Sequence, residues 1–433
     1  MFNVLAAAWA LFLGMALLMV GNGMQGTLLG VRGEIEGFST LEMSFVMSAY
    51  FAGFLGGSKL APEMIRRVGH VRVFAALASF ISAILILYPA ITQPWAWVLL
   101  RVLIGFCFSG VYVTAESWLN NSVTNERRGQ ALSLYMIVQM SGVLAAQALL
   151  VTGDPSGFVL FIIPSVLVSM SFAPILLSAT PTPAFETTKP MSLLRLYQSS
   201  PLGCVGIFLV GGVYSAQFGM ASVYASQIGF SVREVAIFVG AIYLGGLILQ
   251  FPIGWLSDRL DRRLMILGAA ALGGVVCILG LWPDPSLALL CVAAFVLGGM
   301  ANPLYPLLIA YTNDYLDYED MSAASGGLIF IFGLGAIAGP LAIGVLIGWL
   351  GPMGFWVFLG VLMLALAAYA GYRMTRRASP DRDEYGQYIP ITPTTHAVTL
   401  DAAQEWLQEQ AEEEEEQSAT ADGTDDTDTR AAG

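Results

Sequence analysis

Long apolar segments separated by short polar breaks repeat along nearly the whole chain. A helix that crosses a bilayer needs about 20 predominantly apolar residues. Segments of that length, bounded by charged residues or by Pro and Gly, predict twelve spans. We expect them at residues 5–29, 41–61, 71–91, 95–119, 129–152, 157–178, 201–225, 234–256, 263–282, 286–312, 322–348 and 353–374. The pattern therefore predicts an all-α membrane protein with twelve transmembrane helices.

The longest internal break, residues 179–200, divides the predicted spans into two sets of six. This break is rich in Pro, Ser and Thr and contains Lys189 and Arg195. Two six-helix pseudo-repeats in one chain are a known internal symmetry of multi-span membrane folds. We therefore expect an N-terminal six-helix bundle at 1–178, a cytoplasmic central loop at 179–200 and a C-terminal six-helix bundle at 201–374.

Composition supports the bilayer as the solvent of this body. The chain is 56% hydrophobic and 12% charged, with a mean hydropathy of +0.71, whereas a soluble domain carries about 25% charged residues. The net charge of -12 comes almost wholly from residues 375–433, which include the run Glu412 to Glu416. Such a segment cannot bury enough apolar area to fold, so we expect a mostly disordered, acidic cytoplasmic tail. A solvated tail and a tail that binds a cytoplasmic partner both fit this composition.

The distribution of basic residues predicts the orientation in the membrane. With the N-terminus in the cytoplasm, nearly all of the 19 Lys and Arg residues fall in cytoplasmic segments. Only Arg32 and Arg233 fall in outside loops, and Arg101 lies within a span. Because cytoplasmic loops are enriched in Lys and Arg, we expect both termini inside and the protein in the cell (inner) membrane. The basic residues are too scattered to predict a nucleic-acid interface.

One charged loop between two apolar segments carries a recognisable motif, Gly-Trp-Leu-Ser-Asp-Arg-Leu-Asp-Arg-Arg at residues 254–263. It resembles the loop motif of the major facilitator superfamily, G-x-L-x-D-R-x-G-R-R, and departs from it at Asp261. A degenerate copy, residues 62–70, follows the second span. The strings Glu-Ser-Trp-Leu-Asn at 116–120 and Ile-Arg-Arg-Val-Gly-His at 65–70 resemble the YcaD-like branch of that superfamily. The resemblance implies a transporter that works by alternating access.

The motif loop and Glu116 are our candidates for a gate on the cytoplasmic side. The resemblance implies that Glu116, near the end of the fourth span, joins arginines of the loop after the second span. We expect it to pair with Arg66, Arg67 or Arg128 and to hold that side shut in one state. A proton carrier or a substrate contact is the alternative role for Glu116. The remaining gate residues come from the motif: Gly254, Asp258, Arg259 and Arg262.

Arg101 is a charge within the fourth span, where ionisable residues are costly and indicate a function. It resembles the start of the superfamily's fourth-helix motif, and that resemblance implies a part in ion coupling or contact with an anion. A structural cation bonded to carbonyls or lipid phosphate is the alternative.

Uncharged polar side chains recur in the spans that would line a central cavity. Amides and phenols can bind a polar solute without the cost of a buried charge, although helix–helix hydrogen bonding explains any single one equally well. Gln25 and Gln217 are the strongest candidates because they occupy similar places in the two halves. The full set of substrate-cavity candidates is Asn22, Gln25, Tyr112, Gln139, Tyr214, Gln217, Asn302 and Tyr305.

No pattern in the chain predicts catalysis or a metal site. The four cysteines lie within apolar runs without metal-ligand spacing, and no nucleotide-binding loop or hydrolase motif is present. We therefore expect no cofactor and no enzyme activity. The sequence instead predicts a secondary active or facilitative transporter of a small polar or amphiphilic solute, with protons or another ion as a coupling partner. A non-transporting sensor or scaffold that acts through the acidic tail is the alternative.

Overall fold

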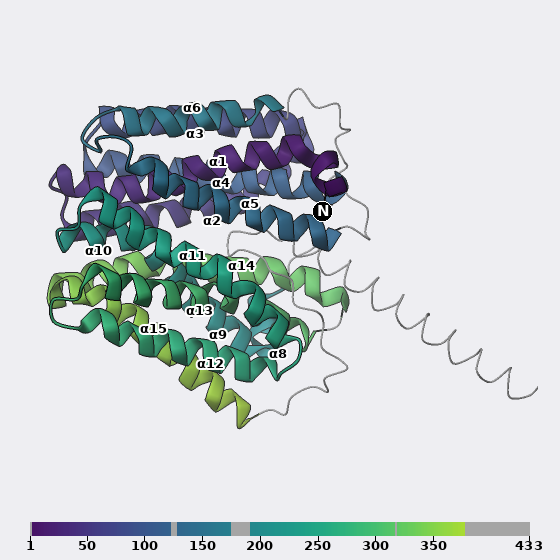
Figure 1. The fold of residues 1–433 in the computed structure, drawn as a ribbon. Coiled ribbons are helices and arrows are strands. Elements are labelled where there is room, and N and C mark those ends of the chain that lie inside the picture. The colour runs from purple at the N-terminus through teal and green to yellow at the C-terminus, as the bar shows by residue number, and fades with distance from the viewer. Residues whose placement is uncertain (1, 123–127, 175–190, 317, 377–433) are drawn as a thin grey trace, which may run out of the picture.

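The computed structural model describes residues 2–122, 128–174, 191–316 and 318–376, and all regular structure within these ranges is helical (Figure 1). Nine segments of this described part are long and apolar enough to cross a membrane. One of them, Ala323–Met374, contains two successive helices. The chain is therefore an integral membrane protein, while the count of twelve crossings stays a prediction. The acidic tail lies almost entirely outside the described residues.

Six helices pack on one another to form what we call the first helix group. Helix α1 contacts α5 and α6, α2 contacts α4, and α3 contacts both α4 and α6. Helix α6 ends at Ser171, residues 173 and 174 are again helical, and the end of the predicted span, 175–178, lies outside the described residues. The bounds are α1 (Phe2–Ile35), α2 (Thr40–Val68), α3 (His70–Ala90), α4 (Pro94–Ser122), α5 (Arg128–Leu150) and α6 (Val159–Ser171).

The remaining helices form the second helix group, in which α9 contacts α14 and α11 contacts α13. A short helix, α8 (Leu193–Ser199), lies inside the predicted central loop, the first part of which, 179–190, is outside the described residues. The other elements are α9 (Pro201–Ser215), the π-helix η2 (Ala216–Met220), α10 (Ala221–Gln227), α11 (Val232–Ser257), α12 (Arg262–Val276), η3 (Cys277–Leu281), α13 (Leu287–Asn313), α14 (Tyr318–Leu350), η4 (Gly351–Met353) and α15 (Gly354–Met374).

The two groups are related by an internal repeat that is visible in their turns. Ser39 caps α2 in a capping box with Glu42, and Ser231 caps α11 in the same way with Glu234. Each box is preceded by a turn whose glycine, at 37 or 229, has a φ of 76° or 82°. The serine pair, the glutamate pair and the glycine pair all have the same separation in sequence. The same local chemistry therefore ends one helix and starts the next at equivalent places of the two groups.

Glycines repeat in the same register where two helices of each group cross most closely. A Cβ atom on Gly53 would lie 1.9 Å from the carbonyl oxygen of Val102, and one on Gly245 would lie 1.9 Å from that of Phe295. Such distances leave no room for a side chain, so glycine allows the backbones of α2 and α4, and of α11 and α13, to touch. The repeat therefore fixes the scaffold that carries the central residues.

The two groups lie as two layers that meet along α2 and α14, α5 and α11, and α1 and α10 (Figure 1). We call the end with the α2–α3 and α11–α12 turns the basic end, since it carries Arg66, Arg67, Arg259 and Arg262. The end with the α1–α2, α10–α11 and α14–α15 turns is the opposite end. Large apolar side chains such as Trp349, 79% exposed, cover the outer surface, as expected for contact with lipid.

Candidate functional site

Arg101 on α4 is fully buried and begins a chain of polar side chains in the middle of the first group. Its Nη1 donates to Oε1 of Gln25 at 2.8 Å, and Nε2 of Gln25 donates to Oδ1 of Asn22 at 3.1 Å. Nδ2 of Asn22 in turn donates to the hydroxyl of Tyr112 at 2.7 Å. We call Arg101, Gln25, Asn22 and Tyr112 the polar chain. Four predicted site residues on α1 and α4 are thus brought together.

The charge of Arg101 is held without a carboxylate. Its Nε lies 3.4 Å from the carbonyl oxygen of Val46, its Nη2 lies 3.4 Å from Sδ of Met47, and its guanidinium is 4.8 Å from the ring centre of Tyr50. No Asp or Glu among the residues that the structure describes forms an ion pair with it. A buried cation is costly unless acceptors surround it, and the oxygens of Val46 and Gln25 supply them here.

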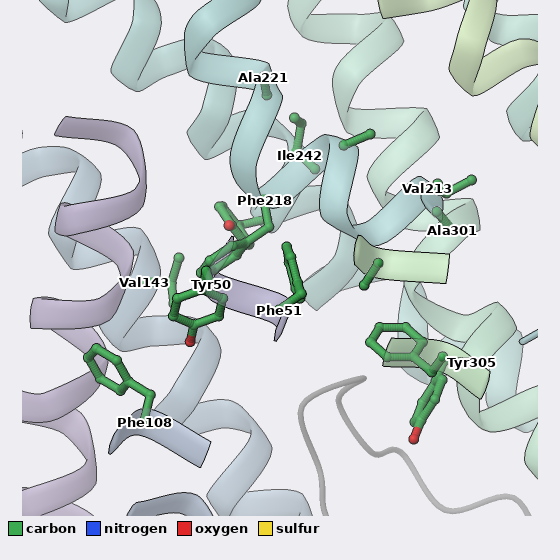
Figure 2. Packing of buried hydrophobic residues seen from close by; sticks show 14 of the residues in the cluster. Tyr50, Phe51, Phe108, Val143, Val213, Phe218, Ala221, Ile242, Ala301 and Tyr305 are labelled. Carbon is green, nitrogen blue, oxygen red and sulfur yellow. The ribbon is translucent and has the colours of Figure 1, made fainter. Parts of the chain in front are cut away.

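An unbroken series of aromatic rings joins the two groups next to the polar chain. Tyr50 and Phe51 on α2 contact Phe218 on η2 at centroid distances of 5.8 and 6.3 Å (Figure 2). Both distances lie in the usual range for aromatic pairs. We call the series the aromatic belt; between Tyr112 and Tyr305 it comprises Phe54, Phe108, Tyr50, Phe51, Phe218, Tyr214 and Phe332.

The repeat provides counterparts of the polar chain in the second group, but their surroundings differ. Gln217 corresponds to Gln25, with the same separation as the capping serines. Tyr305 corresponds to Tyr112, with the separation of the glycine pair Gly105 and Gly298 that lets α2 approach α4 and α11 approach α13. Both counterparts are buried.

These counterparts keep unused hydrogen-bonding capacity. Within the described part of the chain, Nε2 of Gln217 and the hydroxyl of Tyr305 have no hydrogen-bond partner. The cause is in the sequence: Ala294 stands at the position that corresponds to Arg101, and Tyr214 at the position that corresponds to Asn22. A buried donor without a partner is unfavourable, so these two atoms are suited to contact a ligand.

Gln217 also lies in an unusual stretch of backbone. Residues 216–220 form the π-helix η2 between α9 and α10. Single π-turns within α-helices often occur at functional sites, because the extra residue reorients neighbouring side chains. In this chain the π-turn carries Phe218 of the aromatic belt beside Gln217.

Three other predicted cavity residues have more ordinary surroundings. Nδ2 of Asn302 donates to the carbonyl of Gly298 one turn earlier, and its side chain packs where Gly246 leaves space. Tyr214 stacks on Phe218 within the belt. Gln139 is buried on α5. The structure therefore places Asn302 in helix packing and Tyr214 in the belt.

At the basic end, Arg66 and Arg67 pair with Glu63 rather than with Glu116 in this conformation, so the pairing that we expect in one state stays a prediction. Nε of Arg66 lies 2.7 Å from Glu63, and Nε of Arg67 lies 2.6 Å from the same carboxylate, so both arginines are held within their own helix. Hydrogen bonds from Arg66 and then Arg67 lower the pKa of Glu63 to about 2, so it stays ionised near neutral pH. A carboxylate one helical turn away is reached more easily than one on another helix.

Glu116 is buried, and the hydroxyl of Tyr135 on α5 donates to its Oε1 at 3.4 Å. The adjacent Ser117 lies 2.9 Å from Nε2 of His70, the first residue of α3. Arg128 is the first residue of α5, and its side chain lies outside the described part, so its predicted pairing with Glu116 stays a prediction.

The motif loop is organised around Arg262, whose side chain is 1% exposed. Its Nη1 donates to both oxygens of Asp314, at 2.6 and 2.8 Å, while Asp258 lies at 3.9 Å. Arg259 is exposed and stacks on Trp255 at 3.9 Å, and Gly254 accepts a hydrogen bond from Ser257. The sequence did not indicate Asp314, because this residue follows a different span from the motif loop. It did not indicate Tyr50 either, because an aromatic ring within an apolar span is usually part of the core.

Comparison with known proteins agrees with this architecture. A sequence profile of the Major Facilitator Superfamily matches residues 11–224 and 203–403. An uncharacterized MFS-type transporter, YcaD of Escherichia coli, is 28% identical over 333 residues, which are 76% of this chain and 85% of YcaD. The YcaD of Salmonella arizonae is 25% identical over 338 residues, 76% of this chain and 86% of that protein.

Solved structures show the same fold at low sequence identity. The crystal structure of the D323A mutant of the nucleoside transporter NupG superposes with a TM-score of 0.75 at 14% identity, over 84% of this chain and 99% of that one. A second NupG structure gives a TM-score of 0.69 at 14% identity, over 87% of this chain. Because the family profile covers both helix groups, this chain belongs to the major facilitator superfamily of membrane transporters.

Proposed function

We propose that the chain moves a small polar or amphiphilic solute by alternating access, either driven by an ion gradient or by facilitated diffusion. The solute would bind between the polar chain and the second group, beside the aromatic belt. The observation that carries this proposal is the contrast between the two repeats. Gln25 and Tyr112 are connected to Arg101, whereas Gln217 Nε2 and the Tyr305 hydroxyl remain buried without partners.

These groups define the chemistry of the solute. Arg101, Gln217 and Tyr305 all offer hydrogen-bond donors, so the solute should present acceptors such as a carboxylate, a carbonyl or a ring nitrogen. The aromatic belt supplies flat apolar surfaces that favour an unsaturated or aromatic portion. Binding would supply the acceptors that the second group lacks, which is why we place the solute there.

The contacts between the groups support an alternating mechanism. Along α2 and α14 they run from Ser44 beside Gly344, near the opposite end, to Lys59 over the ring of Phe330 at 4.5 Å. The last nine residues of α2, which carry Arg66 and Arg67, extend beyond this series. We infer that this conformation is closed at the opposite end, and that the basic end, which we assign to the cytoplasm, is where the solute enters or leaves.

The motif loop would act as a latch in this cycle. Asp258, Arg262 and Asp314 tie the α11–α12 turn to the end of α13 at the basic end. Movement of the second group would change the surroundings of this cluster. Asp258→Ala should therefore lower solute flux while membrane insertion is retained, and undiminished flux would remove Asp258 from the mechanism.

A thermal-shift screen of the purified protein against metabolites, at two pH values, tests the central site. A ligand that binds only the folded state stabilises it and so raises the apparent melting temperature. The added stability is about 2.7 kcal/mol when the ligand concentration is one hundred times the dissociation constant. We expect acceptor-rich hits whose shift is lost in Gln217→Ala and Arg101→Ala. Asn302→Ala is the matched control, because its amide already bonds within its own helix. A hit that is indifferent to Gln217 and Arg101 would place the solute elsewhere.

A further inference from the structure

A cavity lies far from the midline, in the second group at the opposite end. It has a volume of about 410 Å³, in the range of small-molecule sites. Three turns form it: the one after α10, the segment between η3 and α13, and η4. Tyr224, Phe230 and Trp282 contribute aromatic surface, Met353 contributes a flexible apolar side chain, and Asp284 is the one charged residue of the lining.

The corresponding places of the two groups are packed by different rings. In the first group, the corresponding place is filled by Trp97, which packs against Phe38 at 4.8 Å and Tyr88 at 5.6 Å. Trp97 also donates from Nε1 to the carbonyl oxygens of Tyr88 and Ile91. The corresponding residues of the second group are Phe230 for Phe38, Gly280 for Tyr88 and Leu290 for Trp97. The ring of Trp356 packs over Gly280, where a Cβ atom would lie 2.1 Å from it, and the cavity lies beside this contact.

Asp284 has a backbone conformation that is rare for its type. Its φ is 49°, and it is the single non-glycine residue with a positive φ in the described chain. Glycine would adopt this conformation more easily, and Asp is tolerated there at some cost. Strain of this kind is often retained where a side chain has a role. The role that the lining indicates is to set one negative charge at the mouth of an aromatic pocket.

We infer that this cavity binds an organic ammonium ion with an attached apolar or aromatic portion. A cation is attracted to the faces of Trp and Tyr rings, and the Asp284 carboxylate adds direct attraction. The acidity of the opposite end also favours a cation: Glu34, Glu36, Glu42, Asp154, Glu234 and Asp284 lie there against Arg32 and Arg233. The site is separate from the proposed solute site, since its lining includes no residue of the polar chain or the aromatic belt.

Titration of the full chain with benzyltrimethylammonium tests this inference. The chain would carry 13C-methyl methionine, in nanodiscs of phosphatidylglycerol, and the Met353 signal, assigned with Met353→Leu, reports binding. We expect a saturable shift of that signal, weakened roughly two- to fivefold by Trp282→Ala and by Asp284→Asn. Asn also tolerates a positive φ, so the loop should keep its shape. Asp154→Asn, which removes an acid at the same end outside the cavity, should leave the titration unchanged.

Several outcomes would overturn the inference. They are an unchanged Met353 signal, an equal shift with neutral benzyl alcohol, and equal weakening by Asp154→Asn and Asp284→Asn, which would indicate only the general field of that end. A repeat in phosphatidylethanolamine nanodiscs separates two sources of ammonium. If phosphatidylethanolamine weakens the binding of benzyltrimethylammonium, the lipid headgroup is the occupant. If the titration is unchanged, the occupant is a free cation. Both results support an ammonium site.

Discussion

Replacing Gly344 by valine should prevent the opposite end from closing. Gly344 lies on α14, and a Cβ atom there would be 2.6 Å from Cβ of Ser44 and 2.5 Å from its Oγ. Ser44 is fully buried on α2, so it has no free space to move into. The substitution therefore acts on a contact between the two helix groups rather than within one of them.

The size of the effect follows from these distances. A Cβ–Cβ distance of 2.6 Å is far inside van der Waals contact, and forcing extra atoms into a packed interface costs about 1–3 kcal/mol. Since each 1.4 kcal/mol is a factor of ten, the population closed at the opposite end should fall about 5- to 150-fold relative to the open one. Gly344→Ala should give a smaller shift in the same direction.

A distance measurement between the groups detects this shift without a known solute. Spin labels at Glu34→Cys and Arg233→Cys, both exposed at the opposite end, would be placed in a background with all four native cysteines replaced by alanine. We expect one short electron–electron distance in the parent protein and an added longer one in Gly344→Val.

The control is one turn further along the same helix. A Cβ atom on Gly348 would meet nothing within 4 Å, so Gly348→Val should keep the parent distance distribution. If Gly344→Val also keeps it, the conformation is not set by this contact. If both variants change it, the effect comes from α14 itself, and the assignment of the interface is refuted.

Two further pairs of substitutions test the scaffold around the site. Asp314→Ala should destabilise the protein by about 3–5 kcal/mol, because it leaves Arg262 buried without its main partner. Asp258→Ala should cost no more than about 1 kcal/mol, since Asp258 is partly exposed and 3.9 Å away; equal losses in chemical unfolding would contradict this ranking. Gly53→Ala should lower the melting temperature because its Cβ would overlap a backbone oxygen of α4, whereas Gly56→Ala, whose nearest neighbour is at 3.9 Å, should not.

The sequence predicted the helical architecture well, because every backbone polar group must be satisfied inside a bilayer and only long apolar helices do this. It also predicted that Gln25 and Gln217 are counterparts, since both lie at the same distance from the next capped turn. What it could not supply was the choice between neighbours on one helix and neighbours on another. Glu63 takes both arginines that were expected to reach Glu116.

The contacts of buried polar residues were equally hidden. Arg262 selects Asp314, which directly follows the next span α13, and only the packed structure brings them within 2.6 Å. The role of Tyr50 beside Arg101 was missed for a related reason: its ring is as apolar as its neighbours, so periodicity does not distinguish it. Sequence patterns report which groups avoid water, whereas pairing depends on how the helices cross.

The aromatic belt has a consequence for the speed of the proposed cycle. Hydrogen bonds are directional and must break before two surfaces can slide, whereas rings attract one another over a broad range of tilts and at centroid distances of about 4.5–7 Å. The contacts of Tyr50 and Phe51 with Phe218, at interplanar angles of 35° and 71°, already use different tilts. The belt can therefore stay in contact while the two helix groups rotate against each other. We then expect the barrier to rotation to arise at the two ends of the molecule.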